Sequence, residues 1–286
     1  MLKTLRALMQ PPPGMAFDFS QPPGEPALAP LNGVAWRVFA NPVSLFVGGV
    51  AAVLLELAEP SVRAGVWNGG GFKSDPGMRL RRTGFAAMMT VYGPRSAAEK
   101  LIAHVVRAHD AVRGTTPDGL PYCANDPRLL DWVQASAVFG FSEAYHRYVQ
   151  PLSPYEKDAA FAESQAAARL YGATGMPHSW AAWEALLART APSLAGSTIL
   201  SEFLTIMDTA PLLPAPMRPL QRLLVRAAVE IVPAPMRSLP QLRGRGLRAG
   251  EAHLVRAVAR AIALLPLGDT PPLQAARRLA GSHTKP

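Results

Sequence analysis

The sequence predicts an all-α fold, and three observations lead to that class. Nearly half of the 286 residues are hydrophobic (49%) and only 17% are charged, so the chain can bury a large core. Apolar residues recur at helical spacing in segments that proline and glycine separate. No segment shows the alternation of polar and apolar residues that is typical of a strand. One compact domain is therefore expected.

The first third of the chain combines an arm with a core helix. Residues 1–31 are predicted to form an extended N-terminal arm, because proline and glycine are frequent from residue 10 onward. The longest apolar run, residues 43–58, is shorter than the roughly 20 residues of a membrane span and carries Glu56 near its end. It is predicted to be a buried core helix. Prolines 11–13 stand where a signal peptide would be apolar, so a cytoplasmic location is expected.

Helix-start signals place several of the following elements. Asp126 before Pro127 predicts an N-cap and a helix that runs to about Tyr148. Ser153 and Glu156 form a capping-box pattern that opens a helix to about residue 170. Apolar periodicity predicts further helices over residues 84–92, 95–113, 178–190, 198–207, 217–231, 250–265 and 271–280.

The net charge of +9 is concentrated in the C-terminal part of the chain. From Arg218 onward there are twelve basic and three acidic residues, and the difference of nine equals the whole net charge. These arginines follow helical spacing without interleaved aromatic residues, so no nucleic-acid partner is expected. Residues 251–286 are predicted to form basic helices packed on the main domain. Their basic face is either simply solvated or contacts an anionic membrane surface or an acidic partner.

Several classes of protein are excluded by missing residues and motifs. The single cysteine, Cys123, excludes an internal disulfide framework, a cysteine-based zinc cluster and covalently attached c-type haem. The sequence has no Gly-x-Ser-x-Gly elbow, no Walker loop and no His-Glu-x-x-His motif. Hydrolytic and nucleotide-dependent functions are therefore not supported.

Two polar pairs stand out on segments that are otherwise apolar. Arg79 and Thr83 are four residues apart, as are His109 and Arg113, so each pair is predicted to share one face of a helix. His109 continues the apolar face of its helix and should point into the protein, where Arg113 on the next turn would need an anion. Together the four side chains suit a non-covalently bound porphyrin, and they suit a buried hydrogen-bond network equally.

Five motifs follow one another along the chain: Glu59–Trp67, Phe72–Thr83, His109–Gly114, Tyr122–Pro127 and Leu130–Val133. This succession resembles the MpaB and latex-clearing-protein family. The similarity covers roughly residues 30–250 and implies a globin-related, all-helical domain that binds haem b over residues 32–250. Characterised relatives are oxygenases that use dioxygen to cleave carbon–carbon double bonds in isoprenoid chains, including rubber and a prenylated fungal intermediate.

The resemblance implies a role for each of five residues. His109 corresponds to the axial iron ligand, and Arg79 and Arg113 would lie near the haem propionates or the haem edge. Thr83, and next to it Arg82, would be the donors toward bound dioxygen. Arg82 replaces a lysine of the rubber oxygenases that can ligate iron, and an arginine stays protonated, so the distal position is expected to be open.

Gly69 and Gln134 stand where relatives often have histidine. Three functions remain open: a haem-dependent oxygenase acting on an apolar substrate, a non-catalytic haem sensor or carrier, and a helical interaction protein without haem. Phe85, Met88 and Met89 would form an apolar wall toward a substrate together with the core helix. The alternative for these three side chains is ordinary core packing.

Overall fold

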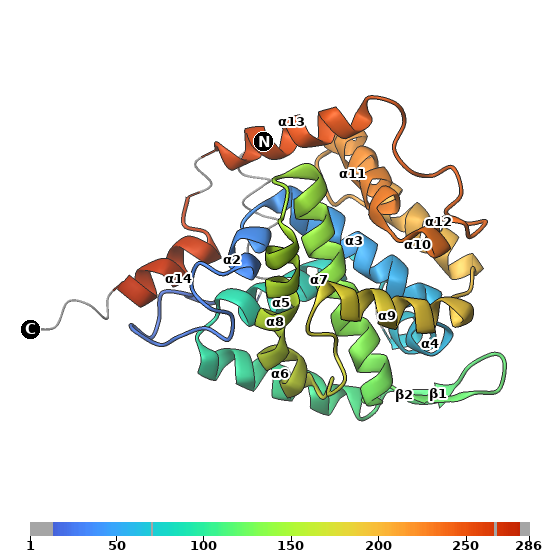
Figure 1. The fold of residues 1–286 in the computed structure, drawn as a ribbon, viewed down its shortest axis with the longest axis horizontal. Coiled ribbons are helices and arrows are strands. Elements are labelled where there is room, and N and C mark those ends of the chain that lie inside the picture. Colours follow the sequence, from blue (N-terminus) through green and yellow to red (C-terminus); the bar gives the residue numbers. More distant parts are fainter. Residues whose placement is uncertain (1–13, 70, 266–267, 281–286) are drawn as a thin grey trace, which may run out of the picture.

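The computed structural model describes residues 14–69, 71–265 and 268–280, and it confirms the all-α fold (Figure 1). Within these ranges the strands are two short ones, β1 (Arg113–Thr115) and β2 (Pro121–Cys123), which pair as an antiparallel hairpin. The helical elements are α2 (Val34–Phe39), α3 (Pro42–Ala58), α4 (Pro60–Gly69), α5 (Pro76–Tyr92), α6 (Arg95–His109), α7 (Pro127–Tyr148), α8 (Pro154–Tyr171), α9 (Trp180–Thr190), η1 (Ala191–Ser193), α10 (Thr198–Thr209), η2 (Ala215–Met217), α11 (Arg218–Ile231), α12 (Ala234–Arg237), α13 (Glu251–Ala263) and α14 (Pro271–Ala280).

The core is built around α3, which confirms the prediction of a buried helix. This helix packs against α2, α4, α7, α10, α11 and α13, and its closest partner is α7. The two backbones nearly touch where glycines meet. A Cβ on Gly48 would lie 2.6 Å from Cα of Phe141, and a Cβ on Gly140 would lie 2.5 Å from the carbonyl oxygen of Gly48. Only glycine permits this approach, because any side chain would force the helices apart.

An aromatic cluster joins α7 to the helices that follow it. Trp132 and Phe139 of α7 stack on Trp183 of α9 with ring centroids 5.5 and 4.9 Å apart. Trp132 also donates a hydrogen bond of 3.2 Å to the carbonyl oxygen of Leu55 in α3, so its polar atom is satisfied inside the core. The carboxyl-terminal half of α3, which carries Glu56, is thereby held rigidly in the centre of the domain.

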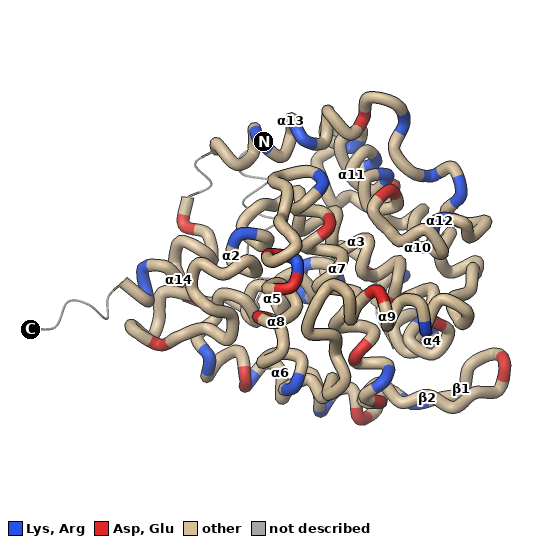
Figure 2. Tube along the Cα trace, in the orientation of Figure 1, with Lys and Arg blue, Asp and Glu red and all other residues tan. Residues whose placement is uncertain are grey.

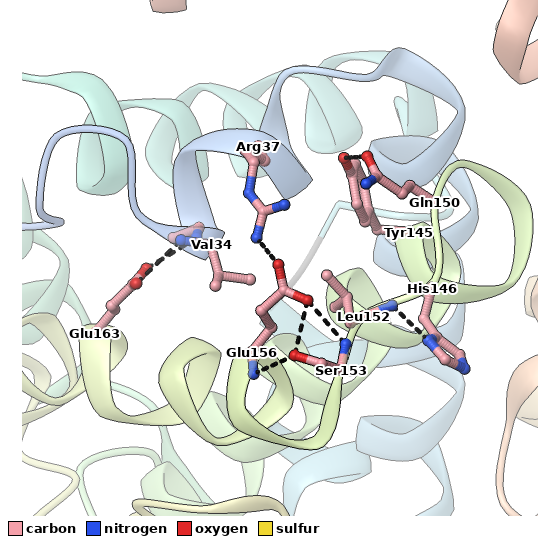
Figure 3. Close-up of polar contacts among 10 residues, drawn as sticks. Val34, Arg37, Tyr145, His146, Gln150, Leu152, Ser153, Glu156 and Glu163 are labelled. Carbon is pink, nitrogen blue, oxygen red and sulfur yellow. Dashed lines mark hydrogen bonds and ion pairs between the residues drawn. The ribbon is translucent and has the colours of Figure 1, made fainter.

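The short helix α2 is anchored on α8 by carboxylates (Figure 3). Glu163 accepts hydrogen bonds from the backbone N–H groups of Val34 (3.0 Å) and Ala35 (2.9 Å), which are free donors at the start of α2. Arg37 of α2 forms an ion pair with Glu156. Glu156 also completes the predicted capping box at the start of α8, so one residue both begins a helix and binds its neighbour.

The part of the N-terminal arm that is described, residues 14–31, lies along the body beside α14 (Figure 1). Arg278 of α14 is only 1% exposed and donates hydrogen bonds to the carbonyl oxygens of Phe19 (2.5 Å), Glu25 (2.8 Å) and Tyr92 (2.8 Å). The arm, the end of α5 and the C-terminal helix are therefore tied together at one buried guanidinium. Residues 1–13 of the predicted arm lie outside the described residues.

Three apolar residues expected at a substrate wall pack against this arm instead. Met88 and Met89 are buried in a cluster that includes Phe19, and Phe85 is partly buried against the same cluster. The rings of Phe85 and Phe19 meet edge to face at 6.4 Å. The alternative interpretation, ordinary core packing, is confirmed for the two methionines.

Two predicted helix boundaries are wrong. Helix α5 begins at Pro76 rather than at residue 84, with Asp75 accepting a hydrogen bond from the backbone N–H of Met78 (2.8 Å) as its N-cap. Helix α6 ends at His109 instead of continuing to Arg113. The following residues turn into β1, since the N–H of Val112 already donates to the carbonyl oxygen of His109 (2.9 Å) outside the helix.

The described part of the chain contains no single helix that is both long and apolar enough to cross a membrane. Helices α3 and α4 reach that length and composition only together, and they meet at a bend of 115°. Figure 2 shows lysine and arginine recurring along α13 and the connection before it, which is the basic region noted in the sequence. Helix α13 packs on α3, α7 and α11, and α14 packs on α5.

Candidate functional site

Arg79 lies in the first half of α5 with a buried atom that the protein does not satisfy. Its Nε has no hydrogen-bond partner among the described residues. The guanidinium carbon sits 5.4 Å from the centre of the Phe72 ring, a distance at which a cation is attracted to an aromatic face. Burial lowers the pKa of Arg79, and a neighbouring charge on Arg82 acts in the same direction. A buried cation of this kind requires a compensating anion or acceptor.

The aromatic surface beneath Arg79 is firmly packed. Phe72 is buried, stacks on Trp67 of α4 at 6.2 Å and meets Phe203 of α10 edge to face at 5.4 Å. These rings connect α4, the segment before α5 and α10. The position of the guanidinium is therefore set by side chains that come from three separate parts of the sequence.

Glu56 of α3 is the carboxylate that acts on Arg79. Burial raises the pKa of Glu56 to about 7, although the positive charge of Arg79 works in the opposite direction. In turn the carboxylate of Glu56 raises the pKa of Arg79, but less than burial lowers it. Across the described residues no hydrogen bond or ion pair within 4.0 Å joins the two side chains. Glu56 is therefore a proton-accepting group near neutrality in the centre of the domain.

His109, the last residue of α6, approaches the same site. Its Nδ1 is buried and lacks a hydrogen-bond partner in the part of the chain that the structure describes. Burial is the main cause that lowers the pKa of His109, and Arg79 adds to the effect. The neighbouring side chains of Asn125 and Asp110 oppose it. The imidazole is therefore neutral at neutral pH, which is the form that can donate a lone pair to a metal.

Arg113 does not share this environment, and two predictions about it are wrong. Because α6 ends at His109, Arg113 lies on β1 and not on the same helical face. Its side chain is exposed, and Nε donates a hydrogen bond of 2.8 Å to the carbonyl oxygen of Asp110. The hairpin causes this change, since β1 pairs with β2 and redirects the chain immediately after the helix.

Thr83 and Arg82 are also exposed, so the predicted core position of Thr83 is wrong. The hydroxyl of Thr83 donates a hydrogen bond of 3.0 Å to the carbonyl oxygen of Arg79 one turn earlier. Arg79 and Thr83 do lie on one helix, as predicted, but the second residue faces outward. Of the five predicted site residues, the structure brings Arg79 and His109 together at the site, with Arg82 close enough to influence Arg79 electrostatically.

The residues present fit a haem in part. A partly buried neutral imidazole suits an iron ligand, and a partly buried guanidinium whose Nε has no partner among the described residues suits a propionate. The exposed positions of Thr83 and Arg113 do not contribute to that fit. Sequence reasoning missed two residues of this site. Glu56 was noted only as an interruption of an apolar run, and Asn125 lay in a family motif without an assigned role.

The fold and the site define the class of protein: a predominantly helical domain in which the charge of a partly buried arginine acts on both an inward imidazole and a carboxylate. Residues 36–264 match the family described as "ER-bound oxygenase mpaB/B'/Rubber oxygenase, catalytic domain". The chain belongs to this family of oxygenase catalytic domains.

The similar curated proteins carry no assigned function. An uncharacterised protein of Mycobacterium tuberculosis (strain ATCC 25618 / H37Rv) is 29% identical over 119 residues, and one of Mycobacterium bovis (strain ATCC BAA-935 / AF2122/97) matches equally. Each alignment covers 40% of this chain and 47% of the relative, so the chain spans about half the length of these proteins. No solved structure matches the chain significantly.

Proposed function

We propose that the protein is a haem b-dependent oxygenase that cleaves carbon–carbon double bonds of an apolar, isoprenoid-like substrate with dioxygen. Both oxygen atoms would enter the two carbonyl groups formed from the broken double bond, so the overall reaction needs no external electrons. The observation that carries the proposal is an inward imidazole, His109, within the electrostatic range of Arg79, whose buried Nε has no partner among the described residues, inside an oxygenase domain. The substrate class rests on the family.

His109 and Arg79 would hold the cofactor. His109 stays neutral because burial lowers its pKa, so its lone pair is available for iron. Arg79 remains a cation, and a haem propionate would supply the acceptor that its Nε lacks. When bound, the haem would supply the activation of dioxygen.

The polar residues of the first half of α5 are proposed to act on the dioxygen side. Thr83 is one turn beyond Arg79 and carries a hydroxyl, and Arg82 carries a permanent charge. Because Arg82 does not deprotonate, it would donate hydrogen bonds toward dioxygen and would not bind iron itself. Glu56, whose pKa lies near 7, can hold a proton within the electrostatic range of Arg79.

The proposal is tested by adding haem to the purified protein and recording the visible spectrum. A Soret band is expected for the wild type, and the His109→Ala variant should lose it or shift it. His104→Ala is the matched control, since His104 lies on the same helix and is exposed. No band in the haem-saturated wild type would favour the interaction protein without haem. A band without oxygen uptake in the presence of polyisoprene or terpenoid alkenes would favour a sensor or carrier.

We also propose that the basic C-terminal helices contact an anionic membrane surface. Two exposed leucines support the proposal, Leu254 on α13 (54% exposed) and Leu264 directly after its last residue (85% exposed), because they accompany the exposed Arg260 of this amphipathic helix. Contact with lipid would place the domain where an apolar substrate is dissolved. The cytoplasmic location stays a prediction from the sequence.

A further inference from the structure

Two neighbouring side chains, His109 and Asn125, each carry a buried polar atom whose hydrogen-bonding capacity is not fully used. Nδ1 of His109 and Oδ1 of Asn125 are both buried, and neither makes a hydrogen bond of good geometry among the residues that the structure describes, although the two side chains are close enough for Asn125 to act on the imidazole as a hydrogen-bond partner. The two residues are 16 positions apart in the sequence and lie on opposite sides of the β1–β2 hairpin. Buried polar atoms rarely stay unpaired, so two of them at one place indicate an interaction that the site is built to make.

The orientation of the Asn125 side chain is fixed by its other end. Nδ2 donates hydrogen bonds to the carbonyl oxygen of Val106 (3.0 Å) and to Oδ1 of Asp110 (2.8 Å). Both partners are acceptors only, so rotating the amide by half a turn would set oxygen against oxygen. Oδ1 must therefore remain on the opposite side, where it can accept hydrogen bonds and donate none.

The backbone of Asn125 is equally well defined. On its N-terminal side, the N–H of Ala124 donates to the carbonyl oxygen of Val112 (2.9 Å) and closes the hairpin. On its C-terminal side, Asp126 caps α7 by accepting a hydrogen bond from the N–H of Arg128 (2.9 Å). The hairpin and the helix cap hold the carboxamide against the end of α6, so the acceptor is rigidly placed rather than carried by a free loop.

We propose that Asn125 is a positioning residue: its Oδ1 accepts a hydrogen bond from Nδ1–H of His109 and so makes Nε2 the nitrogen that binds iron. This inference rests on the proposed haem function. An acceptor at Nδ1 selects the imidazole tautomer that carries its proton there and leaves the lone pair on Nε2. Metal-binding histidines generally donate their second ring N–H to such an acceptor, which fixes the ring and makes it a stronger donor. Asn125 would thereby set both the direction and the basicity of the ligand.

Two variants separate this role from a structural one. Asn125→Ala removes both the acceptor and the two donors, whereas Asn125→Asp removes the donors and strengthens the acceptor. If the acceptor matters, the haem midpoint potential should rise in Asn125→Ala and fall in Asn125→Asp, because a more basic imidazole stabilises ferric iron. Haem affinity should fall about 10-fold or more in Asn125→Ala. A purely structural role would move the potential of both variants in the same direction, and that result would overturn the inference.

A second measurement uses the protein without haem. Nitrogen-15 NMR of histidine-labelled protein should show His109 as the Nδ1–H tautomer in the wild type and in Asn125→Asp, and a shift toward Nε2–H in Asn125→Ala. His104→Ala identifies the signals of the other histidine on α6 and should leave His109 unchanged. If the wild type binds no haem, the proposed function fails and the inference fails with it. If the wild type binds haem but the tautomer is the same in all three proteins, only the role of Asn125 is refuted.

Discussion

Glu56→Gln is expected to change the pH dependence of stability more than any surface carboxylate does. Glu56 lies on the central helix α3, and burial raises its pKa from 4.5 to about 7 in the folded protein. The folded state therefore binds the proton more tightly than the unfolded chain. The stabilisation is complete below the unfolded pKa of 4.5 and is lost as the pH rises through about 7. A glutamine stays neutral throughout and cannot lose it.

The magnitude follows from the two pKa values. At about 1.4 kcal/mol for each pH unit, the rise from 4.5 to about 7 corresponds to about 3 kcal/mol of unfolding free energy. Glu56 is half-buried, so solvent screening reduces the expected effect to about 2 kcal/mol. The wild type should lose about that much between about pH 4.5 and pH 8 relative to Glu56→Gln.

Urea unfolding of both proteins at a series of pH values measures this difference directly. Subtracting the two curves removes the contributions of the histidines, which titrate in the same range in both proteins. Glu99→Gln controls for the loss of one negative charge, because Glu99 is exposed on α6. A difference curve for Glu56→Gln that is flat over this range would refute the conclusion that burial outweighs the charge of Arg79.

Two further predictions concern the C-terminal helices. Arg278→Met should lower the unfolding free energy by about 3 kcal/mol, since three carbonyl oxygens, two buried and one partly buried, lose their donor at about 1 kcal/mol each. The exposed neighbour variant Arg277→Met should cost less than about 1 kcal/mol in the same urea titration. Equal losses would show that the arm is not held by Arg278. Replacing Leu254 and Leu264 together by serine should lower binding to anionic vesicles about 10-fold or more in a sedimentation assay, because α13 and its C-terminal end would lose two exposed apolar side chains. Leu170→Ser, at an exposed leucine of α8, is the control and should leave vesicle binding unchanged. Unchanged binding would exclude α13 as the contact.

Helix starts were predictable where a local capping signal was present. Asp126 and Ser153 cap α7 and α8 as expected, because a cap depends only on a side-chain oxygen and the backbone N–H groups of the next three residues. Asp75 before Pro76 carries the same signal as Asp126 before Pro127, and it marks the true start of α5. That boundary was therefore readable from the sequence, although apolar periodicity alone placed it eight residues too late.

The candidate site was predictable in part. The helical spacing of apolar residues around His109 indicated an inward position, and its Nδ1 is buried. The same spacing failed for Arg113, because the chain leaves the helix at His109 and forms a hairpin whose pairing depends on residues 121–123. Thr83 shares a helix with Arg79 but is exposed, since spacing along a helix does not say how far a neighbouring element covers it.

The sequence by itself determined the all-helical class, the buried helix α3, the capped starts of α7 and α8, and the membership in an oxygenase family. These properties follow from local propensity, periodicity and ordered motifs. Only the tertiary structure decided that Glu56 titrates near pH 7 and that Asn125 faces His109. A pKa depends on burial and on charges from other helices, and a hydrogen-bond partner across a hairpin depends on how the chain folds back. Neither is encoded in the spacing of neighbouring residues.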